Sequence, residues 1–108
     1  MNISYEQFSQ CDLRVVTILS CERIEGSDKL LKLKVALDTE ERQVIAGIGK
    51  YYEPENLIGR QVVIIANLEP RTLMGHESQG MLLATDDAEG KPVICSPEHS
   101  VQTGAKIH

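Results

Sequence analysis

The chain has 108 residues, of which 42% are hydrophobic and 25% are charged. These proportions are close to those of ordinary globular domains, so they exclude an intrinsically disordered chain and a collagen-like chain. The length predicts a single domain over residues 1–108. A net charge of -5 disfavours a protein that holds its partner by indiscriminate attraction to phosphate.

The basic residues are unevenly distributed along the chain. Seven of the 11 Lys and Arg residues fall between Arg14 and Lys50, whereas the last quarter of the chain is acidic. This distribution allows a local basic face, although solvated strand faces with interspersed acids would give the same pattern.

Membrane and targeting segments are not expected. The longest purely apolar run, Val62–Ala66, has five residues, whereas a membrane helix needs about 20. Residues 1–4 have neither the basic nor the apolar part of a signal peptide, so we expect a cytoplasmic protein. The three cysteines, Cys11, Cys21 and Cys95, show no Cys-x-x-Cys spacing, which predicts reduced thiols and no thiolate metal site.

The N-terminal part of the chain predicts a short helix and a long strand. Ser4 and Gln7 fit a capping box at the start of a helix over Ser4–Cys11. The next stretch, Leu13–Cys21, is rich in β-branched residues and predicts a strand. Turn-forming residues at 25–28 then reverse the chain.

The middle of the chain predicts two further strands and a short helix. Leu31–Leu37 alternates with a period of two, so one face is apolar while the other carries Lys32 and Lys34. Arg42–Ile48 is expected to be the third strand. Within residues 51–59, a proline and a glycine are placed to open and close one or two helical turns.

The last part of the chain predicts two strands and short extended pieces. Val62–Ala66 is continuously apolar, which is typical of a strand covered on both faces. We expect a loop over Glu69–Gln79 and a fifth strand over Gly80–Thr85. Pro92–Cys95 and Ala105–Ile107 are expected to be short extended segments.

The order of these elements indicates a fold. Three strands, a short helix and two strands match the all-β OB-fold, a five-stranded Greek-key barrel that commonly binds oligonucleotides on its second and third strands and nearby loops. The short N-terminal helix and a C-terminal annex would be additions to this barrel.

Catalytic and metal-binding patterns are weak. The three histidines, His76, His99 and His108, are scattered and do not have the spacing of a helical zinc pair. Gly47-Ile48-Gly49 lacks the third glycine of a dinucleotide-binding turn, because Tyr52 occupies the required position. No nucleophile and base can be paired, so we expect neither an enzyme nor a bound cofactor or metal.

The most unusual stretch is Asn67–Met81. It carries amide, guanidinium and hydroxyl groups, together with Gly75 and Gly80, which permit close approach of the backbone. Such groups can contact phosphate and 2'-hydroxyl groups without much net charge, and Met81 offers a flexible apolar surface to a base or sugar. An ordinary polar hairpin loop would have the same composition.

Six motifs together resemble one tRNA-binding domain family, which comprises the C-terminal dimerisation domain of bacterial methionyl-tRNA synthetase and free-standing structure-specific tRNA-binding proteins. The resemblance covers nearly the whole chain in order. The motifs are Asp12-Leu13-Arg14-Val15, residues 25–33, Ala46-Gly47-Ile48, Ala66-Asn67-Leu68, Pro70-Arg71 and residues 77–81.

The resemblance implies a non-catalytic OB-fold module that binds tRNA by its shape and acts as a homodimer. The matching positions imply contacts to tRNA from Asn67, Ser78 and Met81, with Arg71 and Gln79 beside them. Lys32 and Lys34 fall on the exposed face that the periodicity predicts for the second strand. The family dimer would also cover the outer face of Val62–Ala66 with the N-terminal helix and the C-terminal annex.

Some alternatives stay open. The chain lacks the long basic extension of some eukaryotic relatives, so modest affinity is expected. It could be free-standing, or the partner of a methionyl-tRNA synthetase catalytic domain within a longer chain. A chaperone-like dimer that binds extended peptides in the same groove is a second reading. Single-strand binding by base stacking is a third, but the chain has only four aromatic residues.

Overall fold

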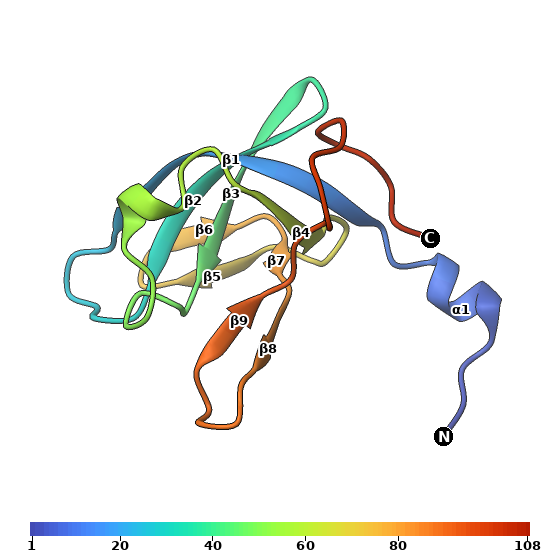
Figure 1. Cartoon of the computed structure of the whole chain (residues 1–108), viewed down its shortest axis with the longest axis horizontal. Coiled ribbons are helices and arrows are strands. Elements are labelled where there is room, and N and C mark those ends of the chain that lie inside the picture. The colour runs from blue at the N-terminus through green and yellow to red at the C-terminus, as the bar shows by residue number, and fades with distance from the viewer.

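The computed structural model describes all 108 residues, and the fold is almost entirely β (Figure 1). Five strands form one curled antiparallel sheet in the order β3-β2-β1-β4-β7, which confirms the predicted OB-like barrel. No helix is long and apolar enough to span a membrane. The elements are α1 (Tyr5–Ser9), β1 (Leu13–Arg23), β2 (Leu31–Leu37), β3 (Glu40–Ala46), the 3-10 helix η1 (Pro54–Asn56), β4 (Gln61–Ile65), β5 (Arg71–Leu73), β6 (His76–Ser78), β7 (Met81–Leu82), β8 (Ala84–Asp86) and β9 (Pro92–Ile94).

Strand β1 organises the sheet because its two halves have different partners. Leu13–Thr17 pairs with β4, whereas Thr17–Arg23 pairs with β2. The pairing with β2 shifts register between Ile18 and Ser20, and such an irregularity bends a strand and increases its twist. The sheet therefore curls around its apolar face instead of lying flat.

The core lies inside this curl and follows the predicted alternation. Leu31, Leu33, Val35 and Leu37 of β2 are all buried. Val62 and Ile64 of β4 also lie in the core cluster. The capping box of α1 is present as predicted, although the helix is shorter than Ser4–Cys11.

Helix α1 and the C-terminal segment were expected to cover the outer face of β4. Val63 points away from the core but is only 8% exposed. The C-terminal segment runs beside β1, where the Val15 N–H donates to Ala105 O at 2.9 Å and the Ile107 N–H donates to Leu13 O at 2.9 Å. Helix α1 buries none of its residues and stands away from the barrel (Figure 1).

The structure differs from the sequence prediction after β4. The stretch Glu69–Gln79, predicted as a loop, contains the β5–β6 hairpin. The strand predicted over Gly80–Thr85 is broken at Leu83, whose N–H donates to Val63 O while its carbonyl accepts from the Cys95 N–H. Beyond that point the chain leaves β4, and β8 pairs with β9. The third strand begins at Glu40 and not at Arg42, because Leu37 pairs directly with Glu40 across a two-residue turn, and it ends at Ala46 and not at Ile48.

One cysteine is chemically distinct from the other two. Cys21 is half-buried against the core, and desolvation raises the pKa of its thiol to about 11. Cys11 and Cys95 are exposed. Because a thiolate is the reactive form, we expect iodoacetamide at pH 8.5 to alkylate Cys21 at least about tenfold more slowly than the others.

Peptide mapping by mass spectrometry measures the three rates, and alkylation in concentrated urea is the control that should make them equal. The raised pKa also means that stability is lost as pH rises from about 9 toward 11, because the unfolded thiol ionises first. Equal alkylation rates in the native protein would contradict the assigned environment of Cys21.

Candidate nucleic-acid interface

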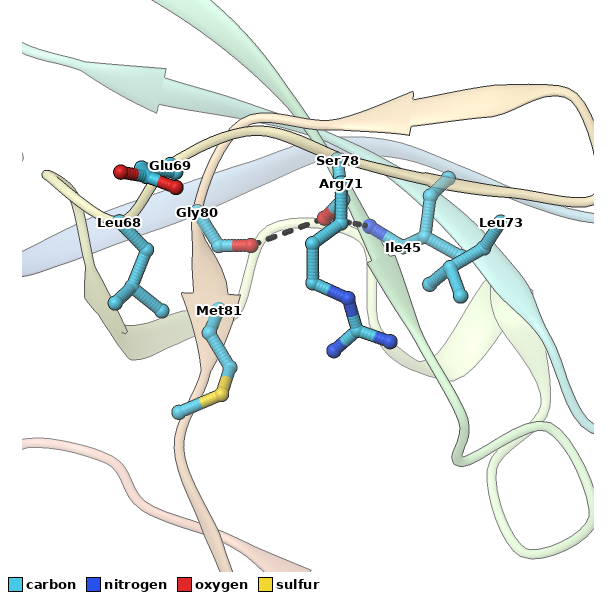
Figure 2. A pocket seen from close by; sticks show the side chains of 8 residues that line it. All are labelled: Ile45, Leu68, Glu69, Arg71, Leu73, Ser78, Gly80 and Met81. Carbon is cyan, nitrogen blue, oxygen red and sulfur yellow. Dashed lines mark hydrogen bonds between the residues drawn. The ribbon is translucent and has the colours of Figure 1, made fainter.

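A groove of about 490 Å³ opens between strand β3, the β5–β6 hairpin, the β7–β8 segment and the β1–β2 turn. Most of its walls are apolar, and Lys29 and Arg71 are its charged residues. The remaining lining residues are Ser27, Leu30, Ile45, Ala46, Gly47, Ile48, Leu73, Met74, Met81, Leu82 and Ala84. A smaller recess beside it joins Arg71, Ser78 and Met81 (Figure 2).

Ser78 closes the barrel next to this groove. Its side chain is buried, and its hydroxyl accepts from the Ile45 N–H at 2.9 Å and donates to Gly80 O at 2.9 Å (Figure 2). Gly80 is suited to this position because a β-carbon there would lie 3.1 Å from Ile65 O. The hydroxyl of Ser78 is therefore occupied within the protein, and any influence on a ligand passes through the backbone it holds.

Gln79 completes the closure. Its N–H donates to Gln43 O at 2.7 Å, and its side-chain Oε1 accepts from the Gln43 N–H at 3.0 Å. The Gln43 amide in turn donates to Glu77 O at 2.9 Å. We call the contacts of Ser78 and Gln79 with Gln43 and Ile45 the barrel clasp.

Asn67 has a comparable structural position just after the end of β4. Its Oδ1 accepts from the Asp12 N–H at 2.8 Å, and its Nδ2 donates to Gln10 O at 2.7 Å. Both functions of the amide are engaged, so Asn67 ties the segment after α1 to the end of β4.

The other predicted site residues lie in the groove or on its face of the sheet. Arg71 and Met81 are exposed in the groove. Lys32 stands opposite Ile45 in the β2–β3 register, and Lys34 stands opposite Gln43, so both lysines share the groove's face of the sheet. Lys32 pairs with Glu22 at 2.9 Å, and this hydrogen bond holds the pKa of the Glu22 carboxyl below its usual value.

Ion pairs occupy some of the Lys and Arg side chains and leave the others free to bind an anionic ligand. Six of the 11 Lys and Arg residues have a carboxylate partner within 4.0 Å. Of the five without one, three lie around the groove and its face of the sheet: Lys29, Lys34 and Arg71. The other two are Arg60 and Lys106.

Some participants were missed by the sequence analysis. Gln43 and Ile45 contribute backbone groups to the barrel clasp. Every residue has such groups, so the residue type does not indicate which of them will take part. Lys29 was not predicted as a site residue, and it lines the groove with Met74 only because two distant turns approach each other.

The OB-like barrel has an open groove with apolar walls, and cationic side chains without carboxylate partners lie around it. These features define the class of OB-like binding domains. Residues 13–106 match the family described as "Putative tRNA binding domain". The chain belongs to this family.

Relatives of known sequence and structure agree with this assignment. The chain is 51% identical over 105 residues to the methionine–tRNA ligase of Caldanaerobacter subterraneus and 55% identical over 105 residues to that of Chloroherpeton thalassium. In both cases 97% of this chain is aligned, but it spans only 16% and 15% of the respective ligases. It corresponds to a tRNA-binding domain and not to the catalytic part of such a ligase.

Two solved structures share the whole fold. The MetRS related protein from Pyrococcus horikoshii has a TM-score of 0.94 at 30% identity, covering 100% of this chain and 99% of that one. The chaperone CsaA from Bacillus anthracis has a TM-score of 0.89 at 28% identity and complete coverage of both chains.

The barrel clasp leads to a stability prediction. Ser78→Ala leaves the Ile45 N–H unpaired in the interior, so the free energy of unfolding should fall by about 1–3 kcal/mol. Urea unfolding followed by circular dichroism measures this loss. Thr72→Ala on β5 is the matched control, because the Thr72 side chain is exposed; equal midpoints for the two variants would show that the clasp is not stabilising.

Proposed function

We propose that this chain is a non-catalytic module that binds folded tRNA by its shape and works as a homodimer. It acts either as a free-standing protein or beside a methionine–tRNA ligase catalytic domain, and we place this work in the cytoplasm. The observation that carries the proposal is the family match over residues 13–106, together with the groove that the matched motifs surround.

The charge distribution supports binding of a polyanion by a net-acidic chain. Lys34 and Arg71 carry no ion pair and share one face with the groove, so they can contact phosphate. The carboxylates beside them are those of Glu22, which is paired with Lys32, and Glu69. We propose that Lys32, Asn67, Ser78, Gln79 and Met81 complete this interface, with Asn67, Ser78 and Gln79 acting through the loops that they hold. Contact with roughly 3 to 5 phosphates gives a shallow dependence of affinity on salt.

Filter-binding titrations test the proposal. The ligands are folded tRNA, the same tRNA after heat unfolding, and a single strand of equal length, at one stated salt concentration. The folded form should bind most tightly, because shape is what the module recognises. Equal affinity for all three would refute shape recognition.

Arg71 provides the second test. Arg71→Gln should weaken binding of folded tRNA and reduce the salt slope by about one unit, since one phosphate contact is lost. Arg60→Gln is the matched control, because Arg60 also lacks a carboxylate partner but lies outside the groove, near the Tyr52 ring. The same loss in both variants would mean that only overall charge matters.

A peptide-binding function is the competing reading. The likeness to the chaperone CsaA and the apolar walls of the groove favour it. Competition separates the two: an extended apolar peptide should displace tRNA only if both use the groove.

The N-terminal segment supports the homodimer. Ile3 and Tyr5 are 61% and 77% exposed, and the Phe8 ring lies 6.4 Å from that of Tyr5. We call these three residues the N-terminal surface. A five-residue helix that buries nothing is not stable by itself, and an exposed apolar surface marks a contact with another protein.

Sedimentation velocity at several protein concentrations tests this contact. The unmodified chain should sediment as a dimer, and the double variant Ile3→Ser, Tyr5→Ser should shift it toward monomer. The control is Tyr51→Ser, Ile58→Ser, which removes two similarly exposed apolar side chains elsewhere. A monomer at every concentration for the unmodified chain would exclude the homodimer.

A further inference from the structure

The β5–β6 hairpin turns through an unexpected residue. Leu73 pairs directly with His76, so the turn consists of Met74 and Gly75, with φ of 50° and 82°. Two-residue turns with positive φ at both positions favour Asn, Asp or Gly at the first position. Methionine is unfavourable there, and an unfavourable backbone position points to a role for the side chain that occupies it.

The side chain of Met74 reaches across the mouth of the groove. A β-carbon at Gly26, in the β1–β2 turn, would lie 3.3 Å from the Met74 methyl carbon. Met74 nevertheless remains 55% exposed, and Met81 of β7 is 42% exposed in the same groove. Two flexible thioethers therefore line an apolar slot to which no aromatic residue contributes.

The slot has positive charge beside it. Lys29 and Arg71 both line the groove, and neither has a carboxylate within ion-pair distance. Its volume of about 490 Å³ is in the range of small-molecule sites. An occupant that matches these walls combines a flat apolar body with negative charge next to it.

We propose that the groove takes one unpaired nucleobase of the bound RNA, between Met74 and Met81, with Lys29 and Arg71 on the adjoining phosphates. The proposal rests on the tRNA-binding function proposed above and specifies which feature of the RNA enters the groove. Paired bases are stacked inside a duplex, whereas unpaired bases can be splayed out. The thioether sulfur makes favourable contacts with aromatic rings.

Methyl NMR provides a direct test. With [methyl-13C]methionine the protein gives three signals, from Met1, Met74 and Met81. Folded tRNA should move the Met74 and Met81 methyl signals upfield, because a stacked ring shields them. Met1 is an internal control, since the N-terminus lies far from the hairpin (Figure 1). A fully paired, blunt-ended RNA duplex with a similar number of phosphates should leave both signals in place.

Met74→Asn separates binding from folding. Asparagine suits the turn, so thermal stability should be equal or higher, while the Kd for folded tRNA should rise roughly five- to tenfold. Affinity for the fully paired duplex should not change. Ile58→Asn is the matched control, because Ile58 is 52% exposed in a turn outside the groove.

The outcomes are distinguishable. In one outcome, tRNA binds tightly, the methyl signals do not move and Met74→Asn keeps its affinity. This result overturns the nucleobase site but leaves the tRNA-binding function intact. Absence of binding to folded tRNA at low salt overturns both. Methyl shifts that appear with an apolar peptide and not with tRNA overturn the nucleobase site in favour of a peptide groove.

Discussion

The closure of the barrel depends on the barrel clasp, the hydrogen bonds by which Ser78 and Gln79 hold Ile45 and Gln43 of β3. The edges of the five-stranded sheet are β3 and β7, and a curled sheet forms a barrel only when its edges meet. Here Ser78 joins them by accepting from the Ile45 N–H and donating to Gly80 O. Because these bonds lie directly beside the groove, a change that weakens them alters both the shape of the groove and the stability of the fold.

This closure changes how motif residues are interpreted. Ser78 and Asn67 belong to the motifs that resemble the tRNA-binding family, and the simplest reading of a motif residue is contact with the ligand. Their polar atoms instead hold the protein's own backbone. Arg71 and Met81 are exposed and make no such contacts. In the proposed interface, the residues that hold the loops therefore differ from the residues that are free to contact RNA.

The sequence predicts the features that depend on interactions between residues close together in the chain, and it misses those that depend on distant residues. The alternation in Leu31–Leu37 and the Ser4–Gln7 capping box are local, and both were predicted correctly. The β5–β6 hairpin was missed, because its turn uses Met74 where sequence rules look for Asn or Gly. The break at Leu83 depends on pairing with Val63 and Cys95, and no local pattern contains those partners. The groove combines turns about 45 residues apart, so only its Arg71 and Met81 side could be anticipated.

The isolation of helix α1 has a thermodynamic consequence. None of its residues is buried within the chain. The segment behind it is fastened by the two hydrogen bonds of Asn67 to residues 10 and 12 and by the Ala66 N–H, which donates to Asp12 O. In a chain that associates through this segment, helix formation and association are linked equilibria, so the helical fraction rises with protein concentration. If the proposed homodimer forms through this segment, the first residues would therefore be ordered at high protein concentration and frayed at low concentration.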